Sequence, residues 1–252
     1  MKTQKLLTPL ALAMVAMLSV GAHASGSGAS ADIVDAQNNE GNNAVNDTVE
    51  NTAVVDGSLG GASGNVGVNV AAGDNNQQAN AAAIATADTA FVFGIGVGAS
   101  AQASIDVDQT NHHNEVENHG VPNNAALNNS ANGTSGNVGV NIAAGNSNQQ
   151  KNDMSVASSE TAYTASAYVN VYQDSHDNLV SNESLGGSHG GYGYGYGGGG
   201  NQSGVAVINN AVLSGSLNGV SGNVGANIAA GSGNQQSNSL AIAAGCTACP
   251  NL

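Results

Sequence analysis

The chain has 252 residues and a formal net charge of −14, and it contains 36 Gly, two Phe and no Trp. Large side chains dominate the burial energy of ordinary cores, so we expect no compact globular domain, and we expect the chain alone in water to be largely disordered. The acidic charge excludes nucleic acid as a partner, because that affinity depends on Lys and Arg neutralising phosphates, and it argues equally against anionic membrane surfaces.

The first 24 residues read as a signal peptide. Lys2 and Lys5 precede the apolar run 6–20, which ends at Ala22-His23-Ala24. This run is too short to span a membrane as a stable helix, so a cleaved leader fits better than the alternative, a retained membrane anchor. The mature chain is then expected to begin outside the cytoplasm with an acidic, polar leader at residues 25–50. With one Lys left against 17 acidic residues, its net charge is near −16.

Three copies of one repeat follow, at residues 51–85, 123–157 and 209–243, offset from one another by 72 and 86 residues. Each copy contains the motif SGNVGxN[VI]AAGxxNQQxN. A unit that recurs in this way is expected to gain its stability by stacking on its neighbours.

The repeat itself predicts strands. In its first copy residues 65–70 alternate Asn or Gly with Val, which is typical of a strand with one amide face and one apolar face. Residues 72–76 supply turn residues, and residues 77–85 are expected to form a second strand. A helix is the alternative there, because AAAIA favours helix intrinsically. Upstream, residues 52–55 predict a short strand that ends at the Gly-rich run 57–61.

Unlike segments separate the repeats. Residues 86–122 and 158–208 are rich in Gly, Ser and Asn and hold most of the charge, so they read as linkers. The first linker includes a weak set of metal-ligand types, His113, Glu115, Glu117 and His119, which an extended chain places on one side. A solvated polar linker is the alternative interpretation of this set.

The C-terminal tail, residues 244–252, carries Cys246 and Cys249 in a CxxC arrangement. A zinc site needs further ligands nearby, and a thioredoxin-type enzyme needs a βαβ domain. Neither is present in the sequence, so we expect a structural or assembly role, with an intrachain loop, a link between chains or handling before assembly left open.

These patterns predict an all-β fold: a cross-β or β-solenoid-like stack of three repeat layers with disordered linkers outside it. In a parallel, in-register stack, identical amides form ladders, whereas identical charges would repel. That requirement explains a repeat rich in amides and nearly free of charge. The expected ladder residues are Asn65, Asn69, Gln77, Gln78, Asn80, Asn137, Asn141, Gln149, Gln150, Asn152, Asn223, Asn227, Gln235, Gln236 and Asn238.

The thrice-repeated motif, the signal peptide, the unlike linkers and the terminal CxxC together resemble the fibril subunits of the pseudomonad Fap functional amyloids. The resemblance covers essentially the whole chain, and the long linkers fit the family's major subunit better than its minor one. It implies a homopolymeric fibril on the cell surface that supports biofilm matrix and attachment. It also implies a minor nucleating subunit, a periplasmic chaperone and an outer-membrane export pore as partners, with no membrane insertion.

Two other classes of function remain as alternatives. A monomeric β-solenoid surface adhesin would bind an external ligand, but such solenoids have contiguous repeats and polar capping ends. An enzyme lacks support, because no acidic pair, Ser/His/Asp set or cofactor fingerprint stands out and the Gly runs lack the Lys and helix of a phosphate loop. We therefore expect a structural, self-assembling protein without catalytic residues or cofactors.

Overall fold

The computed structural model describes residues 19–23, 28–87, 90–92, 95–97, 100–159, 164–183 and 207–245. Throughout these residues the regular structure is β-strand, and none of it is helix. The predicted all-β class is therefore confirmed, and the helical alternative for residues 77–85 is wrong. None of the described segments provides a helix with the length and apolarity needed to cross a bilayer.

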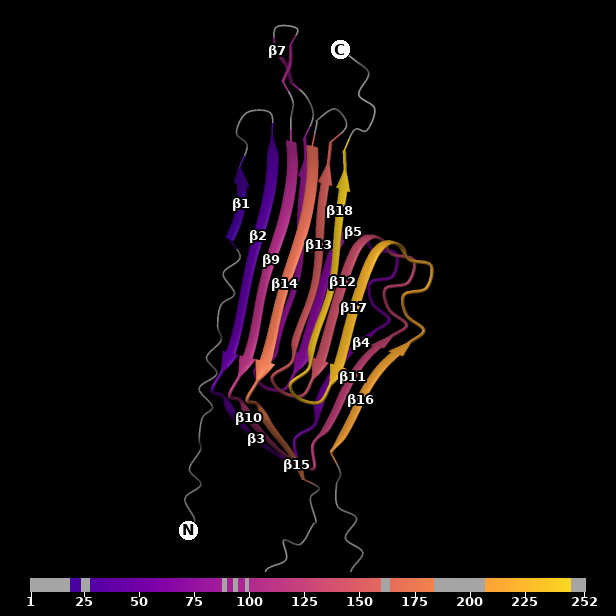
Figure 1. Cartoon of the computed structure of the whole chain (residues 1–252). Coiled ribbons are helices and arrows are strands. Elements are labelled where there is room, and N and C mark those ends of the chain that lie inside the picture. Colours follow the sequence, from indigo (N-terminus) through magenta and orange to yellow (C-terminus); the bar gives the residue numbers. More distant parts are fainter. Residues whose placement is uncertain are drawn as a thin grey trace, which may run out of the picture.

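Fifteen of the strands form three nearly identical layers, each with five strands in the same order (Figure 1). The first layer consists of β2 (Ala29–Glu40), β3 (Asn43–Asp47), β4 (Asn51–Asp56), β5 (Ser63–Ala72) and β6 (Gln77–Thr86). The second consists of β9 (Ser100–His112), β10 (Glu115–His119), β11 (Pro122–Asn128), β12 (Ser135–Ala144) and β13 (Gln149–Ser158). The third consists of β14 (Thr164–His176), β15 (Leu179–Glu183), β16 (Ile208–Ser214), β17 (Ser221–Ala230) and β18 (Gln235–Ala244).

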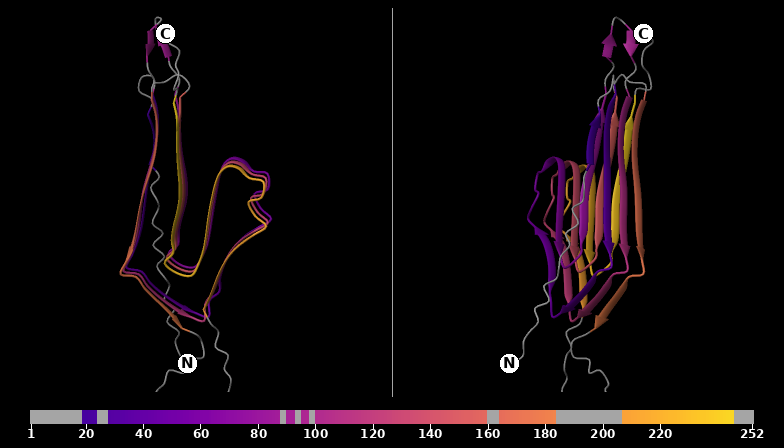
Figure 2. Two further views of the ribbon diagram at one scale, coloured as in Figure 1. Left: turned by 45° about the vertical axis from the view of Figure 1, so that its right-hand side comes forward. Right: turned by 90° about the vertical axis from the view of Figure 1, so that its left-hand side faces the viewer.

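Within a layer the chain follows a folded-back path, seen along the stack in the left view of Figure 2. In the first layer β2 runs down one side, β3 crosses the base and β4 climbs the far side. The chain then turns back, so that β5 descends beside β4 and β6 rises between β5 and β2. Hydrogen bonds join layers and not the strands of one layer, so each strand position builds a separate three-stranded parallel sheet.

The layers are stacked in strict register. Position by position, Ser63–Ala72 pairs with Ser135–Ala144, which pairs in turn with Ser221–Ala230. The second strand of the repeat behaves identically, with Gln77–Thr86, Gln149–Ser158 and Gln235–Ala244 aligned. A slip of one residue would move every side chain to the opposite face of its sheet, so identical faces along the stack hold this register.

Two apolar clusters stabilise the layer. One lies between the β2–β9–β14 sheet and the β6–β13–β18 sheet and is built mostly of Ala, with Ile105 and Val107 at 0% and 1% exposure. The other lies between the β4–β11–β16 and β5–β12–β17 sheets and is centred on Leu127, Val140 and Ile142. The Val face of residues 66–70 belongs to the second cluster, as the alternation in the sequence predicts.

The interpretation of the leader and linkers as segments outside the stack needs correction. Residues 29–47, 100–119 and 164–183 form in-register parallel strands and complete the base and one side of every layer. Sequence comparison missed the match because the last two segments are offset by 64 residues, whereas the repeats that follow them are offset by 86. The difference is an insertion between β15 and β16, and it hides the similarity from any comparison made at a single offset.

Three further strands lie at the margins. β1 (Ser19–His23) pairs antiparallel with β2 on the outer edge of the first layer. β7 (Ala90–Val92) and β8 (Ile95–Val97) form a small antiparallel pair beyond the upper end of the stack (Figure 1). The signal-peptide prediction therefore concerns residues that partly lie against β2, and removal of that peptide would uncover this edge.

Candidate assembly site

All five predicted amide columns form within the chain. Asn141 Nδ2 donates to Asn69 Oδ1 at 2.9 Å, and Asn227 Nδ2 donates to Asn141 Oδ1 at 2.9 Å. The columns that begin at Asn65, Gln77, Gln78 and Asn80 continue in the same way, with donor–acceptor distances between 2.6 and 3.0 Å. Each amide both donates and accepts along the column, so a column has a free acceptor or donor only at the first and last layers.

Two of these columns also bond to each other across the space between the β5–β12–β17 and β6–β13–β18 sheets. Asn152 Nδ2 donates to Asn141 Oδ1 at 2.8 Å, and the equivalent pairs in the other layers are 2.7 Å apart. Asn141 has no exposed surface. A buried polar network stabilises a unique structure only when its members are satisfied, and this network meets that condition at every layer.

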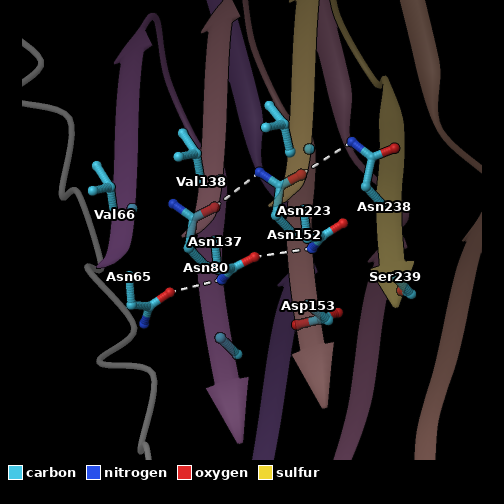
Figure 3. Close-up of a pocket in the computed structure, with 15 residues that line it drawn as sticks. Asn65, Val66, Asn80, Asn137, Val138, Asn152, Asp153, Asn223, Asn238 and Ser239 are labelled. Carbon is cyan, nitrogen blue, oxygen red and sulfur yellow. Dashed lines mark hydrogen bonds between the residues drawn. The ribbon is translucent and has the colours of Figure 1, made fainter. Parts of the chain in front are cut away.

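A groove of about 310 Å³ lies between the same two sheets, and Figure 3 shows the Asn side chains that line it. The groove exists because Gly139 and its equivalents leave room for the facing amides. A Cβ at Gly139 would come within 2.4 Å of Asn80 Oδ1 and within 3.1 Å of Asn152 Cβ. The Gly in the centre of the motif is therefore required for the close approach of the two amide columns.

The turn after each first strand follows the same logic. Gly73, Gly145 and Gly231 have φ values of 103°, 112° and 102°, which are poorly accessible to other residues. A Cβ at Gly145 would also come within 2.2 Å of the Gly231 carbonyl oxygen in the next layer. The conserved geometry of this turn lets the layers stack at backbone contact distance, which the Gly at this motif position makes possible.

Sequence reasoning missed several ladders. Within the repeats, it missed the columns that begin at Asn51 and Asn76. Outside the repeats, it missed the columns of Gln37, Asn42 and Asn46. The signal for the outer columns was present, since Gln109 and Gln173 or Asn118 and Asn182 match at an offset of 64 residues.

Charge enters the interior of the stack at one place. Lys151 of β13 is fully buried and lies against the Asp35 carboxylate of β2, while Asp153 Oδ1 is 3.4 Å from Lys151 Nζ. Burial raises the pKa of Asp153 to about 6, although Lys151 opposes the shift. Neither carboxylate oxygen of Asp153 has a hydrogen-bond partner, so this group stores unfavourable energy when it is ionised.

The two outer layers differ from the middle one in exposure. Most of β12 and β13 is buried, whereas every residue of β16 is exposed and β18 is exposed or half-buried along its length. β3 to β6 on one side, and β14 to β18 on the other, are the edge strands of their sheets among the described residues. Such an edge presents backbone donors and acceptors that another strand can pair with.

The structure does not bring together the four residues singled out as weak metal ligands. Glu115, Glu117 and His119 share one face of β10, with His119 Nε2 3.9 Å from Glu117. His113 lies in the preceding turn with a φ of 52° and faces Asp177 at 3.5 Å. Cys246 and Cys249 lie outside the described residues.

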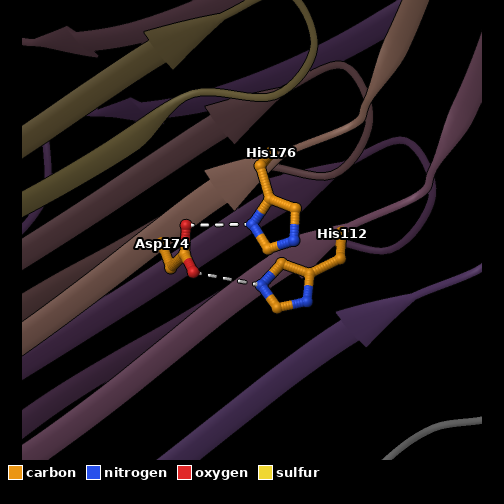
Figure 4. A group of neighbouring side chains, drawn as sticks. All are labelled: His112, Asp174 and His176. Atoms are coloured by element: carbon orange, nitrogen blue, oxygen red, sulfur yellow. Dashed lines mark hydrogen bonds and ion pairs between the residues drawn. The ribbon is translucent and has the colours of Figure 1, made fainter.

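A different group is drawn together at the end of β9 and β14, where His112, Asp174 and His176 meet (Figure 4). A hydrogen bond with Asp174 raises the pKa of His176, and the same hydrogen bond lowers the pKa of Asp174. Sequence reasoning missed this group because His112 and His176 align only at the offset of 64 residues.

These features define a class: a self-stacking repeat protein whose layers are joined by backbone ladders and amide columns and whose terminal layers are open. The family model described as the functional amyloid protein FapB/FapC family matches residues 29–245. The chain belongs to this family. It is 41% identical over 337 aligned residues to the functional amyloid subunit FapC of Pseudomonas aeruginosa, an alignment that covers 99% of this chain and 98% of that protein. No solved structure matches the chain.

Proposed function

We propose that this protein is the structural subunit of an extracellular functional amyloid, and that it polymerises by placing the third layer of one copy on the first layer of the next. The observation that carries the proposal is the equivalence of the layers. Since β17 pairs with β12 at the same positions at which β12 pairs with β5, β5 of a second copy can pair with β17 in the same register. The contact does not close on itself, so repetition gives a filament.

Charge placement supports growth by stacking. At the position of Lys151 the neighbouring layers hold Ala79 and Ser237, and at the position of Asp35 they hold Val107 and Val171. The buried charges therefore occur once in three layers, and copies in a filament would lie roughly 14 Å apart along its axis. Like charges are thus kept out of direct opposition, which would destabilise the stack.

The wider role follows the family. Secretion through the periplasm, a minor nucleating subunit, a chaperone and an outer-membrane export pore would deliver the chain to the cell surface, where the fibril supports biofilm matrix and attachment. The five-strand layers, and not only the 35-residue repeats, are the units that stack. The role is structural and involves no catalysis.

Fibre diffraction of the purified chain from Ser25 onward tests the proposal. We expect reflections near 4.7–4.8 Å and about 10 Å. A mixture of separately ¹³C- and ¹⁵N-labelled chains should show intermolecular solid-state NMR contacts between Ser221–Ala230 and Ser63–Ala72. A folded monomer that stays soluble at high concentration would instead favour the adhesin, and filaments without these contacts would exclude layer-on-layer growth.

A further inference from the structure

We propose that His112, Asp174 and His176 form a binding site for a divalent transition-metal ion, Zn²⁺ or Cu²⁺, which joins the second layer to the third. The three side chains come from the ends of two neighbouring strands, β9 and β14, and they point toward one another (Figure 4). One potential ligand atom from each residue lies within 4.8 Å of the other two.

The distances suit a metal of this kind. His112 Nε2 is 3.6 Å from Asp174 Oδ2, and His176 Nδ1 is 3.1 Å from Asp174 Oδ1. Ligands that surround a tetrahedral Zn²⁺ at 2.0–2.2 Å are roughly 3.4 Å apart, so small movements of the side chains would complete the site. Two imidazoles and a carboxylate are a ligand set that Zn²⁺ and Cu²⁺ favour over Mg²⁺ or Ca²⁺.

One ligand atom is already poised without another task. His112 Nε2 is buried and has no hydrogen-bond partner. The rings of His112 and His176 lie with centroids 3.9 Å apart and planes inclined by 34°. Stacking of the two layers therefore places two imidazole nitrogens beside one carboxylate, and a metal ion would satisfy the orphaned nitrogen.

The surroundings hold the ligands in position. The Tyr172 hydroxyl donates to Asp174 Oδ2 at 3.3 Å, and Gln235 Nε2 donates to the Asp174 carbonyl at 3.0 Å. The turn that follows each strand is fixed by the column of Asn42, Asn114 and Asn178. Outer contacts of this kind orient metal ligands and strengthen binding.

The site is open on one side. The side chains of His112, Asp174 and His176 are 21%, 32% and 46% exposed, which leaves a position for water or for an external ligand. Three protein ligands with one open position give an exchangeable site in contrast to a closed structural one. The site also requires two layers, because β9 and β14 belong to different layers, so metal binding reports on correct stacking.

Metal titration of the assembled chain tests the proposal. The background variant carries Cys246→Ser and Cys249→Ser, which removes the competing thiols. With ZnCl₂ or CuCl₂ alone as probe, equilibrium dialysis should give one ion per chain, and Cu²⁺ electron paramagnetic resonance should show two imidazole nitrogens. His112→Gln, Asp174→Asn and His176→Gln should each weaken binding at least tenfold, whereas His113→Gln, in the adjacent exposed position, should leave affinity unchanged.

Filament formation is scored separately by fibre diffraction without metal. Filaments that bind no stoichiometric metal, or whose affinity falls equally in the His113→Gln control, would overturn the metal site and leave the proposed function intact. If the chain stays soluble and folded, the same titration on the soluble protein decides the site, while the proposed function fails. A soluble chain without regular structure and without metal binding would overturn both.

Discussion

The ammonium group of Lys151 lies against the carboxylate of Asp35, 116 residues earlier in the chain, and neither side chain is more than 1% exposed. Lys151 stands in the second layer and Asp35 in the first, so the pair joins two layers and two sheets. Asp153 faces the same ammonium from its own strand. The pairing places the only basic residue of the mature chain in the interior and not on the surface.

Loss of Lys151 alone is expected to be strongly destabilising. Lys151→Ala leaves two buried acids without a counter-charge, and breaking a buried pair in this way costs about 3–5 kcal/mol. The matched control is the triple variant Asp35→Val, Lys151→Ala and Asp153→Ala, which installs the residues that the neighbouring layers hold. Guanidinium concentrations that dissolve half of the fibrils should fall for the single variant and stay near wild type, or rise, for the triple variant. Equal losses in both would contradict a charge mechanism.

Fibril stability is expected to decrease as the pH rises from about 4 to 6. The folded pKa of Asp153 is about 6, above the model value of 3.8, so the folded state binds more protons in this window and loses stability on deprotonation. The effect has a ceiling of about 3 kcal/mol, and Lys151 and Asp35 are the charged groups that face it. Asp153→Asn should flatten the dissolution midpoint across this window, while Asp56→Asn at an exposed site should not. An unchanged slope in Asp153→Asn would place the pH dependence elsewhere.

A charge in the amide network should delay assembly. Asn227 is 5% exposed and donates to Asn141 and to the Lys151 carbonyl. Asn227→Asp removes both donors and adds a charge that stacking must bury, so the lag time should lengthen severalfold at neutral pH and recover in part in acid, where the carboxylate is protonated. Asn218→Asp, in an exposed turn, makes the same change in net charge. Dye-binding kinetics that show equal delays for both variants would refute a role for the network.

The central Gly of the motif should not tolerate a methyl group. In Gly139→Ala the new Cβ meets Asn80 Oδ1 at 2.4 Å, so the two amide columns must separate. We expect a loss of about 1–3 kcal/mol, the usual effect of overpacking, measured as a lower dissolution midpoint. Gly60→Ala is the control, because nothing lies within 4 Å of a Cβ there. Should Gly139→Ala match wild type, the close approach of the sheets is not required.

Ile105 should matter more than an Ile inside the repeat. It lies in β9, outside the 35-residue repeat, and has 0% exposure in the Ala-rich cluster. Ile105→Ala should destabilise fibrils by about 2–4 kcal/mol through lost burial and a residual cavity. Ile84→Ala, at a 54% exposed site within the repeat, should change stability by less than about 1 kcal/mol. The reverse order would restore the interpretation of residues 86–122 as a linker.

The sequence by itself determined the strand faces of the repeat, its turns and the register of its layers. Alternation of Val with Asn or Gly is a local property, and identity between copies fixes which residues stack, so Asn69, Asn141 and Asn227 could be aligned without a structure. The family resemblance rested on the same motif and agrees with the family match.

Only the tertiary structure decided how far each layer extends and what faces what across it. The insertion between β15 and β16 changes the offset from 64 to 86 residues, which concealed the pairing of β9 with β14. Contacts between sheets depend on the folded-back path of the layer, which no periodicity encodes. That path, together with burial, joins Lys151 to Asp35 and brings His112 to Asp174, because side chains far apart in sequence become neighbours only when the sheets pack.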